Sequence, residues 1–297
     1  MTKRLFTAMA LLLVPALLLA AAPDDERGWS FSQRLQGSSN SAGIVLKSNS
    51  TVAYKLNSHV QAYAGLPVYF VRESVAISTT GNPTFMNGIG NVYTGITMSV
   101  SKPVLNYTSD LVLTAPTGDQ SKGFSTGQVT VDWTNTFSRT FSNVTPYASL
   151  GVANTISDTS FFVRPFSSKG LVGHFELGTV LNVAPQLSIG ASGYGVRATG
   201  EQRIISKVVE EPAAQQSPTQ SVIGSVTQGL GLGRQRQGVF EKRGNTLGPA
   251  DIANDNGFST WFTVRPSRTT DFQIGYSRSV SYQLSSLFFG VGFRVGQ

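Results

Sequence analysis

The sequence has 297 residues, of which 13% are charged, and it contains no cysteine. A soluble domain of this size usually carries about twice that fraction of Asp, Glu, Lys and Arg, so the composition argues against a large surface in water. Disulfides cannot hold the fold, and an extensive hydrogen-bonded sheet is the alternative. The formal net charge is +7, but the basic residues are scattered, so the sequence predicts no nucleic-acid partner.

The chain begins with a basic pair, Lys3 and Arg4, and an apolar stretch over 5–22 that ends in three alanines. A secretory signal peptide has this pattern. An anchor helix is the alternative, because the stretch approaches the length that spans a membrane. The small residues at its end favour cleavage near Ala22. We therefore predict a signal peptide over 1–22 and one domain over 23–297. The mature chain keeps 21 of the 23 basic residues against 16 acidic ones, a net charge of +5.

Most of the remaining chain alternates between apolar and polar residues, which is the pattern of strands whose two faces meet different surroundings. The alternation is clearest near the end, where Leu287, Phe289, Val291 and Phe293 are separated by small or polar residues, with Phe288 as the exception. The alternation predicts about twelve strands, over 29–35, 42–56, 60–70, 89–100, 104–115, 128–137, 144–153, 171–182, 186–198, 258–265, 272–279 and 285–295.

The predicted connections alternate between short turns and long polar loops. The short turns are 57–58, 101–103, 138–143, 183–185 and 266–269, and the long loops are 72–88, 116–127, 154–170 and 200–257. Bacterial outer-membrane barrels have short periplasmic turns, long outer loops and an even strand number. A closed barrel also leaves no unpaired strand edge in lipid, whereas a soluble sandwich gives no reason for sorted loops. The sequence predicts an all-β, transmembrane antiparallel barrel in the bacterial outer membrane.

The segment 200–257 differs from the other loops in length and composition. It begins with apolar pairs, Ile204-Ile205 and Val208-Val209, and then becomes rich in Gln, Pro, Gly and Ser. Such a loop can be mobile at the surface, or it can fold into the barrel as a constriction. Its composition favours the mobile outer loop.

One loop carries a motif with a family resemblance. The strand that ends at Ala115 is followed by Pro116, Thr117, Gly118 and Asp119, and then by Lys122, Gly123 and Gly127. Pro and Gly here also make a good turn. The pattern resembles the meta-pathway phenol-degradation family of outer-membrane transporters, in which a Pro-Thr-Gly-Asp loop and a Lys-Gly precede the next strand. The segment 88–92 resembles the family's Gly-x-Gly-Asp pattern, with Asn91 in place of Asp.

The resemblance covers roughly 88–199. It implies a passive channel or transporter for small molecules of a hydrophobic or aromatic class. Apart from the resemblance, the predicted outer-membrane barrel has two expected partners besides the permeant, namely outer-membrane lipid and the barrel-assembly machinery. The closing strand is followed by Gly296-Gln297 rather than by the usual aromatic residue.

The alternation places a set of charged and tyrosine side chains on the lumenal face. Such groups give barrels their selectivity, or they pair with one another and brace the barrel. Both roles can hold at once. The lumen-facing selectivity candidates are Asp110, Asp132, His174, Glu176, Arg265, Arg294, Tyr63 and Tyr69, and the same face carries Tyr93 and Tyr147.

Catalytic interpretations of these residues are weaker. Asp110 and Asp132 lie on adjacent strands and could form a carboxylate pair. A Ser-His-carboxylate hydrolase would need His174 on the membrane-facing rim rather than in the lumen. With two histidines and no cysteine, the sequence predicts no metal site and no cofactor. It predicts a channel that is not an enzyme. The alternatives are a structural or surface-interaction barrel with a plugged lumen and an outer-membrane hydrolase.

Overall fold

The computed structural model describes residues 27–76, 78, 83–156, 158–159, 162–209 and 238–296. The predicted signal peptide over 1–22 lies outside these residues and stays a prediction. The described chain forms a closed antiparallel barrel of twelve strands, as the sequence predicted. The barrel strands are β1 (Gly28–Asn40), β2 (Gly43–Lys55), β3 (Val60–Glu73), β4 (Phe85–Ile89) with β5 (Tyr93–Ser101), β6 (Asn106–Thr114), β7 (Thr130–Ser138), β8 (Val144–Ala153), β10 (Val172–Ala184), β11 (Leu187–Ala198), β14 (Asp255–Val264), β15 (Thr270–Ser279) and β16 (Leu284–Gly296).

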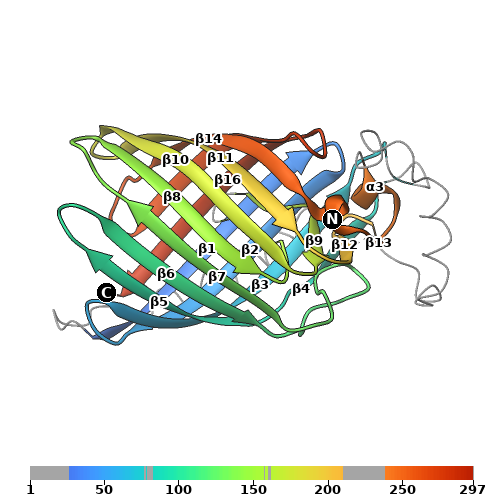
Figure 1. Cartoon of the computed structure of the whole chain (residues 1–297), viewed down its shortest axis with the longest axis horizontal. Coiled ribbons are helices and arrows are strands. Elements are labelled where there is room, and N and C mark those ends of the chain that lie inside the picture. Colours follow the sequence, from blue (N-terminus) through green and yellow to red (C-terminus); the bar gives the residue numbers. More distant parts are fainter. Residues whose placement is uncertain are drawn as a thin grey trace, which may run out of the picture.

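The barrel closes where the first and last strands meet. β1 pairs with β16 on one side and with β2 on the other, and β2 pairs in turn with β3. The C-terminal end of β16 lies at the end of the barrel that carries the short turns (Figure 1). In Figure 1 the smaller elements β9, β12, β13 and α3 gather at the opposite end. The predicted sorting of turns and loops therefore places the long loops together.

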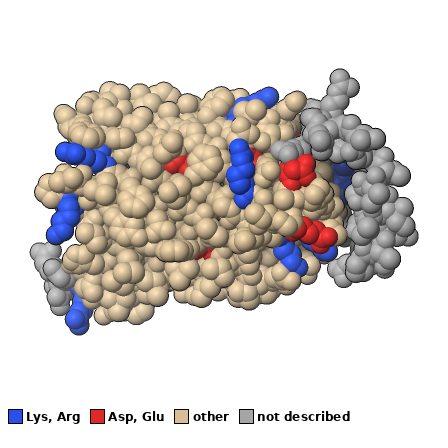
Figure 2. Space-filling model, viewed as in Figure 1, with Lys and Arg blue, Asp and Glu red and all other residues tan. Residues whose placement is uncertain are grey.

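The alternation of the closing strand is present in the structure. Leu287 and Phe289 point outward and are 65% and 39% exposed, whereas Phe288 between them is 1% exposed and lies inside the barrel. Phe288 breaks the pattern because the lumen at this height is packed rather than filled with water. Figure 2 shows a mainly uncharged side wall, with Lys and Arg side chains toward both ends of the barrel. An apolar outer wall of this kind suits lipid.

The predicted strand over 89–100 is interrupted. β4 pairs with the upper part of β3, and β5 pairs with its lower part, so the two share one position in the barrel. The break falls at 90–92, where the loop with the family motif supplies hydrogen bonds: Thr117 Oγ1 accepts one from the Val92 amide, and Asn91 Oδ1 accepts one from the Gly118 amide. Side-chain and loop groups thus replace missing ladder bonds.

Two connections at the long-loop end are short. β1 runs on to Asn40, beyond its predicted end, and a two-residue turn leads into β2. Four residues, 280–283, join β15 to β16. The regular alternation of short turns and long loops therefore fails on both sides of the β1–β16 junction. Other loops fold over this part of the long-loop end of the barrel.

A second, three-stranded sheet lies at the long-loop end. It is formed by β9 (Phe166–Lys169), β12 (Gln202–Ser206) and β13 (Asn245–Gly248), accompanied by the short helices α3 (Val239–Lys242) and η2 (Ala250–Ala253). The described parts of the segment 200–257 are therefore folded, and β14 begins at Asp255, before the predicted strand. Residues 210–237, where the predicted mobile stretch falls, lie outside the described residues.

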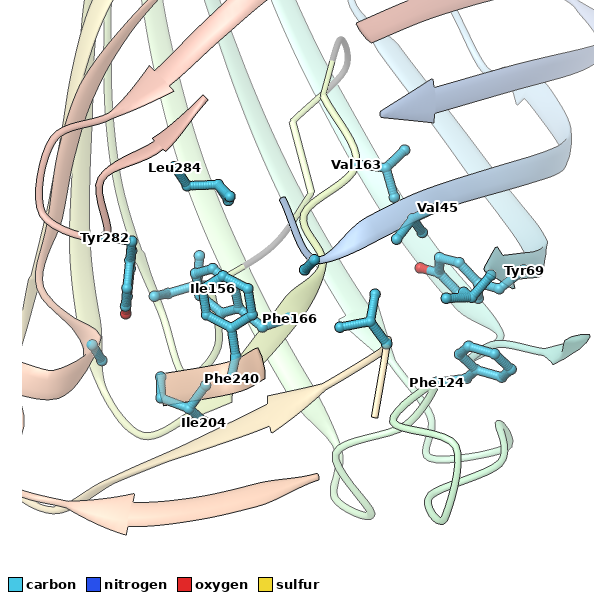
Figure 3. Close-up of a cluster of buried hydrophobic side chains, with 14 of the residues drawn as sticks. Val45, Tyr69, Phe124, Ile156, Val163, Phe166, Ile204, Phe240, Tyr282 and Leu284 are labelled. Atoms are coloured by element: carbon cyan, nitrogen blue, oxygen red, sulfur yellow. The ribbon is translucent and has the colours of Figure 1, made fainter. Parts of the chain in front are cut away.

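An apolar cluster fixes this sheet inside the barrel end. Phe166 of β9 stacks on Phe240 of α3 with ring centroids 4.8 Å apart, and both are 1% exposed. Figure 3 shows these rings beside Ile204 and Tyr282, with Tyr69 of the barrel wall facing Phe124. Burial of this apolar surface holds the loops in the mouth of the barrel. Across the described part of the chain, no helix is long and apolar enough to span a membrane.

Candidate functional site

A cavity of about 590 Å³ lies inside the barrel. Its wall is formed by inward side chains of the strands from β2 to β11, and its loop-side end is formed by parts of three connections, namely 115–129, 154–171 and 199–209. We call the described residues of 154–171 and 199–209 the plug, because residues of both segments line the cavity. The cavity is of the size that small-molecule sites usually have.

The structure places most of the predicted lumenal residues together. Six line this one cavity, and Tyr147 reaches it through a hydrogen bond to Glu176. Tyr93, from the same predicted face, lines it as well. The six are Tyr63, Tyr69, Asp110, Asp132, His174 and Glu176.

The two predicted arginines lie away from the cavity. Arg265 follows β14 in an exposed turn, where its amide donates to the Gln186 carbonyl. Arg294 is exposed near the end of β16. Both are at the short-turn end of the barrel.

Asp110 is held by two hydroxyl groups from neighbouring strands. Tyr63 Oη donates to Asp110 Oδ2 at 2.8 Å, and Thr97 Oγ1 donates to Asp110 Oδ1 at 2.6 Å. The Tyr63 ring lies over Gly95 of β5, where a Cβ atom would come within 2.4 Å of the ring. Glycine at this position lets the ring pack against the wall, which leaves the lumen open beside it.

Two further carboxylates complete an acidic wall. Tyr147 Oη donates to Glu176 Oε1 at 2.6 Å. His174 Nε2 lies 3.1 Å from Asp132 Oδ1, which also accepts a hydrogen bond from Thr134. Among the described residues, no Lys or Arg forms a salt bridge with any of the three carboxylates, Asp110, Asp132 and Glu176. Hydroxyl groups and one imidazole stabilise these carboxylates, which leaves their negative charge facing the cavity.

The plug adds a buried ionic cluster that the sequence did not predict. Asp158 Oδ2 lies 3.0 Å from Lys47 Nζ of β2, and Asp158 Oδ1 lies 2.9 Å from Lys207 Nζ. Burial alone would raise the pKa of Asp158, but the Lys207 and Lys47 cations outweigh it and hold this pKa well below its ordinary value. Asp158 is therefore ionised and ties both plug segments to β2.

A second ion pair holds the plug on another part of the wall. Arg164 Nη1 lies 2.9 Å from Asp255 Oδ2 of β14, and the two side chains are 5% and 0% exposed. Asp255 also accepts hydrogen bonds from Tyr194 and Ser279.

One local signal in the sequence indicated a folded plug: the apolar pairs Ile204-Ile205 and Val208-Val209 are unusual in a loop that is exposed to solvent.

Aromatic side chains close the rest of the lumen. Trp261 of β14 and Phe288 of β16 are 3% and 1% exposed and form one cluster with Phe162 of the plug. Tyr147 and Val180 pack against this cluster. The cavity described above lies on the other side of the barrel.

The predicted motif loop lies at the rim. Asp119 Oδ1 accepts hydrogen bonds from the Ser121 hydroxyl at 2.6 Å and from the Lys122 amide. The Ser121 hydrogen bond is the main cause of a lowered pKa of Asp119. Gly123 has a positive φ of 70° and passes so close to the Ser206 carbonyl that a Cβ would collide with it. Pro116, Thr117 and Gly118 complete the turn, which braces the break between β4 and β5.

The chemistry of the site is that of a binding cavity. Within the described ranges, no group of three or more His, Asp or Glu side chains could hold a metal ion. His174 lies in the lumen, on Asp132, and not on the membrane-facing rim that a lipid hydrolase would use. The arrangement can accept polar and aromatic groups from a small molecule.

The fold is similar to that of known outer-membrane channels. The COG4313 outer membrane channel from Pseudomonas putida F1 matches 94% of this chain and 97% of its own, with a TM-score of 0.52 and 10% identity. The NanC porin matches 88% of this chain and 98% of its own, with a TM-score of 0.48 and 7% identity. No family model and no curated protein matches the sequence. The chain therefore has the fold of an outer-membrane channel barrel.

Proposed function

We propose that the protein is a passive channel for small molecules across the bacterial outer membrane. The observation that carries this proposal is the cavity of about 590 Å³ inside a closed barrel. Its wall carries charged, hydroxyl and aromatic side chains, whereas the outer wall of the barrel is apolar, which is the arrangement of a lumen that water and solutes enter. The shared fold with an outer-membrane channel supports the same function.

The permeants that suit this cavity are small molecules with an aromatic ring. Tyr69 stacks on Phe124 with ring centroids 5.2 Å apart, and both side chains line the cavity beside Tyr93. Flat aromatic walls favour flat, partly apolar molecules. The motif resemblance to the phenol-degradation family is consistent with this class. Barrel-assembly machinery and outer-membrane lipid are its expected partners, after removal of the signal peptide.

The acidic wall gives the pore a preference for cations. Asp110, Asp132 and Glu176 present negative charge to the cavity without a Lys or Arg salt bridge among the described residues, and rings of charge set ion selectivity in pores. Arg265 and Arg294 act at the short-turn end, where they meet solutes on the periplasmic side. Replacing Asp110 and Glu176 by Asn and Gln is expected to lower the ratio of cation to anion permeability.

Single-channel recording tests the proposal. Purified, refolded protein in a planar bilayer is expected to give discrete, reproducible current steps. The heat-modifiable gel shift of β-barrels shows that the sample is folded. A folded sample that gives no current over a wide voltage range would contradict the proposal.

A second candidate function has one observation in its favour. The apolar cluster around Phe166 and Phe240 and the ion pairs of Asp158 and Arg164 close the loop-side end of the barrel. A barrel closed in this way could serve as a structural or surface-interaction protein whose outer loops bind a partner. Silent bilayers with folded protein are the result expected for this candidate.

A further inference from the structure

Three cations meet at the loop-side end of the cavity. Lys47 comes from β2, and Arg164 and Lys207 come from the two segments of the plug; all three line the cavity. Two carboxylates face them, Asp158 and Asp255. This leaves one positive charge without a matching carboxylate in a region where the Lys207 and Arg164 side chains are only 4% and 5% exposed. An uncompensated buried charge is costly, so this end of the cavity favours an anion.

One buried donor of these cations lacks a partner, whereas Lys207 Nζ donates to Asp158 and to the Arg164 carbonyl. Arg164 Nη1 binds Asp255, but its buried Nε has no hydrogen-bond partner among the described residues. Burial lowers the pKa of the Lys207 ammonium; Asp158 opposes this effect, and the cations of Lys47 and Arg164 add to it. A further anion near Lys207 would relieve the repulsion among the three cations.

Aromatic faces lie beside the cations. The Tyr69 ring centroid is 5.3 Å from Lys207 Nζ and 5.9 Å from Lys47 Nζ, and the ring stacks on Phe124. The Arg164 guanidinium lies 5.2 Å from the centroid of Tyr194. An anion that fits here therefore carries a flat apolar group next to its charge.

We propose that Lys47, Arg164 and Lys207 form a binding subsite for a small aromatic carboxylate at the loop-side end of the cavity. The carboxylate of the ligand meets the three cations, and its ring packs beside Tyr69 and Phe124. The acidic wall of the same cavity repels the carboxylate and keeps it at the basic end. The subsite rests on the proposed function, because it needs a cavity that small molecules enter.

Equilibrium titration of the folded, full-length mature protein in detergent micelles tests the subsite. Benzoate is the probe; benzyl alcohol has nearly the same shape without the charge, and benzylamine has the opposite charge. Benzoate is expected to bind at least tenfold more tightly than benzyl alcohol, with benzylamine no tighter than benzyl alcohol. Equal binding of benzoate and benzyl alcohol, or a preference for benzylamine, overturns the proposal.

Variants locate the binding. Lys207→Gln and Lys47→Gln are each expected to weaken benzoate binding at least tenfold and to leave benzyl alcohol binding unchanged. Lys169→Gln is the matched control, because Lys169 lies in β9 of the plug but outside the cavity. Arg164→Lys keeps a positive charge for Asp255 and is expected to fold. Because it lacks the planar guanidinium, it is expected to weaken the binding of benzoate but not the binding of benzyl alcohol. Equal losses for both ligands, or an effect of Lys169→Gln as large as that of Lys207→Gln, contradict the assignment.

Binding and conduction are separate measurements. A folded protein that binds benzoate but gives no current in a bilayer contradicts the channel function and leaves the subsite standing. An open channel that binds benzoate no better than benzyl alcohol contradicts the subsite alone.

Discussion

The two sides of this barrel have similar outer faces and different interiors. On the packed half, formed by β14, β15, β16 and β1, Trp261 and Phe288 fill the lumen together with Phe162 of the plug. On the hollow half, formed by β3, β5, β6, β7, β8 and β10, tyrosines and carboxylates line an open cavity. Both halves have an apolar outer face because both face lipid. Their interiors differ because the plug packs against only one of them.

The contacts of the plug explain its position. Arg164 pairs with Asp255 of β14, and the Ser38 hydroxyl of β1 donates to the Val163 carbonyl. Both anchors belong to the packed half, and a further ionic anchor, Lys47, lies on β2 beside it. The plug lines one end of the cavity but does not fill it. Mutations can therefore separate the effects of the wall, the plug and the lipid.

The largest effect is expected at the buried anchor on the packed half. Asp255→Asn leaves the Arg164 cation buried without a charged partner, which costs about 3–5 kcal/mol of unfolding free energy. The plug should loosen, and the single-channel current should rise. Denaturant unfolding of the refolded protein measures the loss. Asp271→Asn is the control, because its pair with Arg34 is about 30% exposed on each side chain and should cost at most about 1 kcal/mol. Equal losses would contradict the role of burial.

Removing the aromatic filling should make the packed half resemble the hollow one. Trp261→Ala creates a cavity in the packed lumen and is expected to cost about 3 kcal/mol. Single-channel conductance should increase if the new space joins the pore. Tyr63→Ala on the hollow half already borders open space, so its stability loss should be smaller. A larger loss for Tyr63→Ala than for Trp261→Ala would show that the two interiors have been assigned the wrong way round.

A lysine on either face of one strand separates lipid from lumen. Leu150 of β8 is 56% exposed on the outer face, and Leu150→Lys is expected to cost about 2–4 kcal/mol of barrel stability in lipid. Ser149 lines the cavity and lies directly across from Glu176 on the neighbouring strand. Ser149→Lys should be tolerated, because opposite charges on paired strands attract. The heat-modifiable gel shift after refolding into lipid vesicles reports the difference. Similar folding yields for both variants would refute the inward and outward assignment.

Acid should loosen the plug through Asp158. Because its pKa is lowered in the folded protein, the ionised Asp158 carboxylate stabilises the plug at pH values above the ordinary aspartate pKa of about 3.9. This stabilisation is lost progressively as the pH falls from that value toward the lowered pKa. Lys47 and Lys207 stay protonated in acid, so they are left as repelling cations. Current recordings should be steady from pH 8 to pH 5 and should change below about pH 4. Asp158→Asn should lack the acid transition, and an identical transition in this variant would remove Asp158 from the explanation.

The smallest effect is expected for a deletion in the longest loop. Removing 212–236 should change the unfolding free energy by less than about 0.5 kcal/mol, because this polar stretch has little apolar surface to bury. A deletion that reached 243 would also remove Phe240, which is 1% exposed and stacks on Phe166. Thermal melts of the two deletions should therefore differ. A shorter deletion that destabilises as much as the longer one would show that 212–236 takes part in the fold.

The sequence predicted the wall far better than the plug. Leu287 and Phe289 alternate with smaller residues because lipid selects one face of every strand, so local spacing carries the signal. The same spacing placed Asp110, Asp132, His174 and Glu176 on the cavity wall. Asp158, Arg164 and Lys207 have no such period, and their partners are distant in the chain: Lys47 is 111 residues from Asp158, and Arg164 is 91 residues from Asp255. Only the folded barrel brings these charges together.

The break between β4 and β5 has a consequence for how this barrel can vary. β3 pairs with β5 below the break and with β4 above it, and the loop at 115–119 binds the backbone between them. A change in length between β3 and β4 can therefore be absorbed by shifting β4 along the upper part of β3. The register of β5 against β3, and with it the shear of the barrel below, stays fixed. We expect insertions before β4 to be tolerated where insertions into an unbroken strand would shift every neighbour.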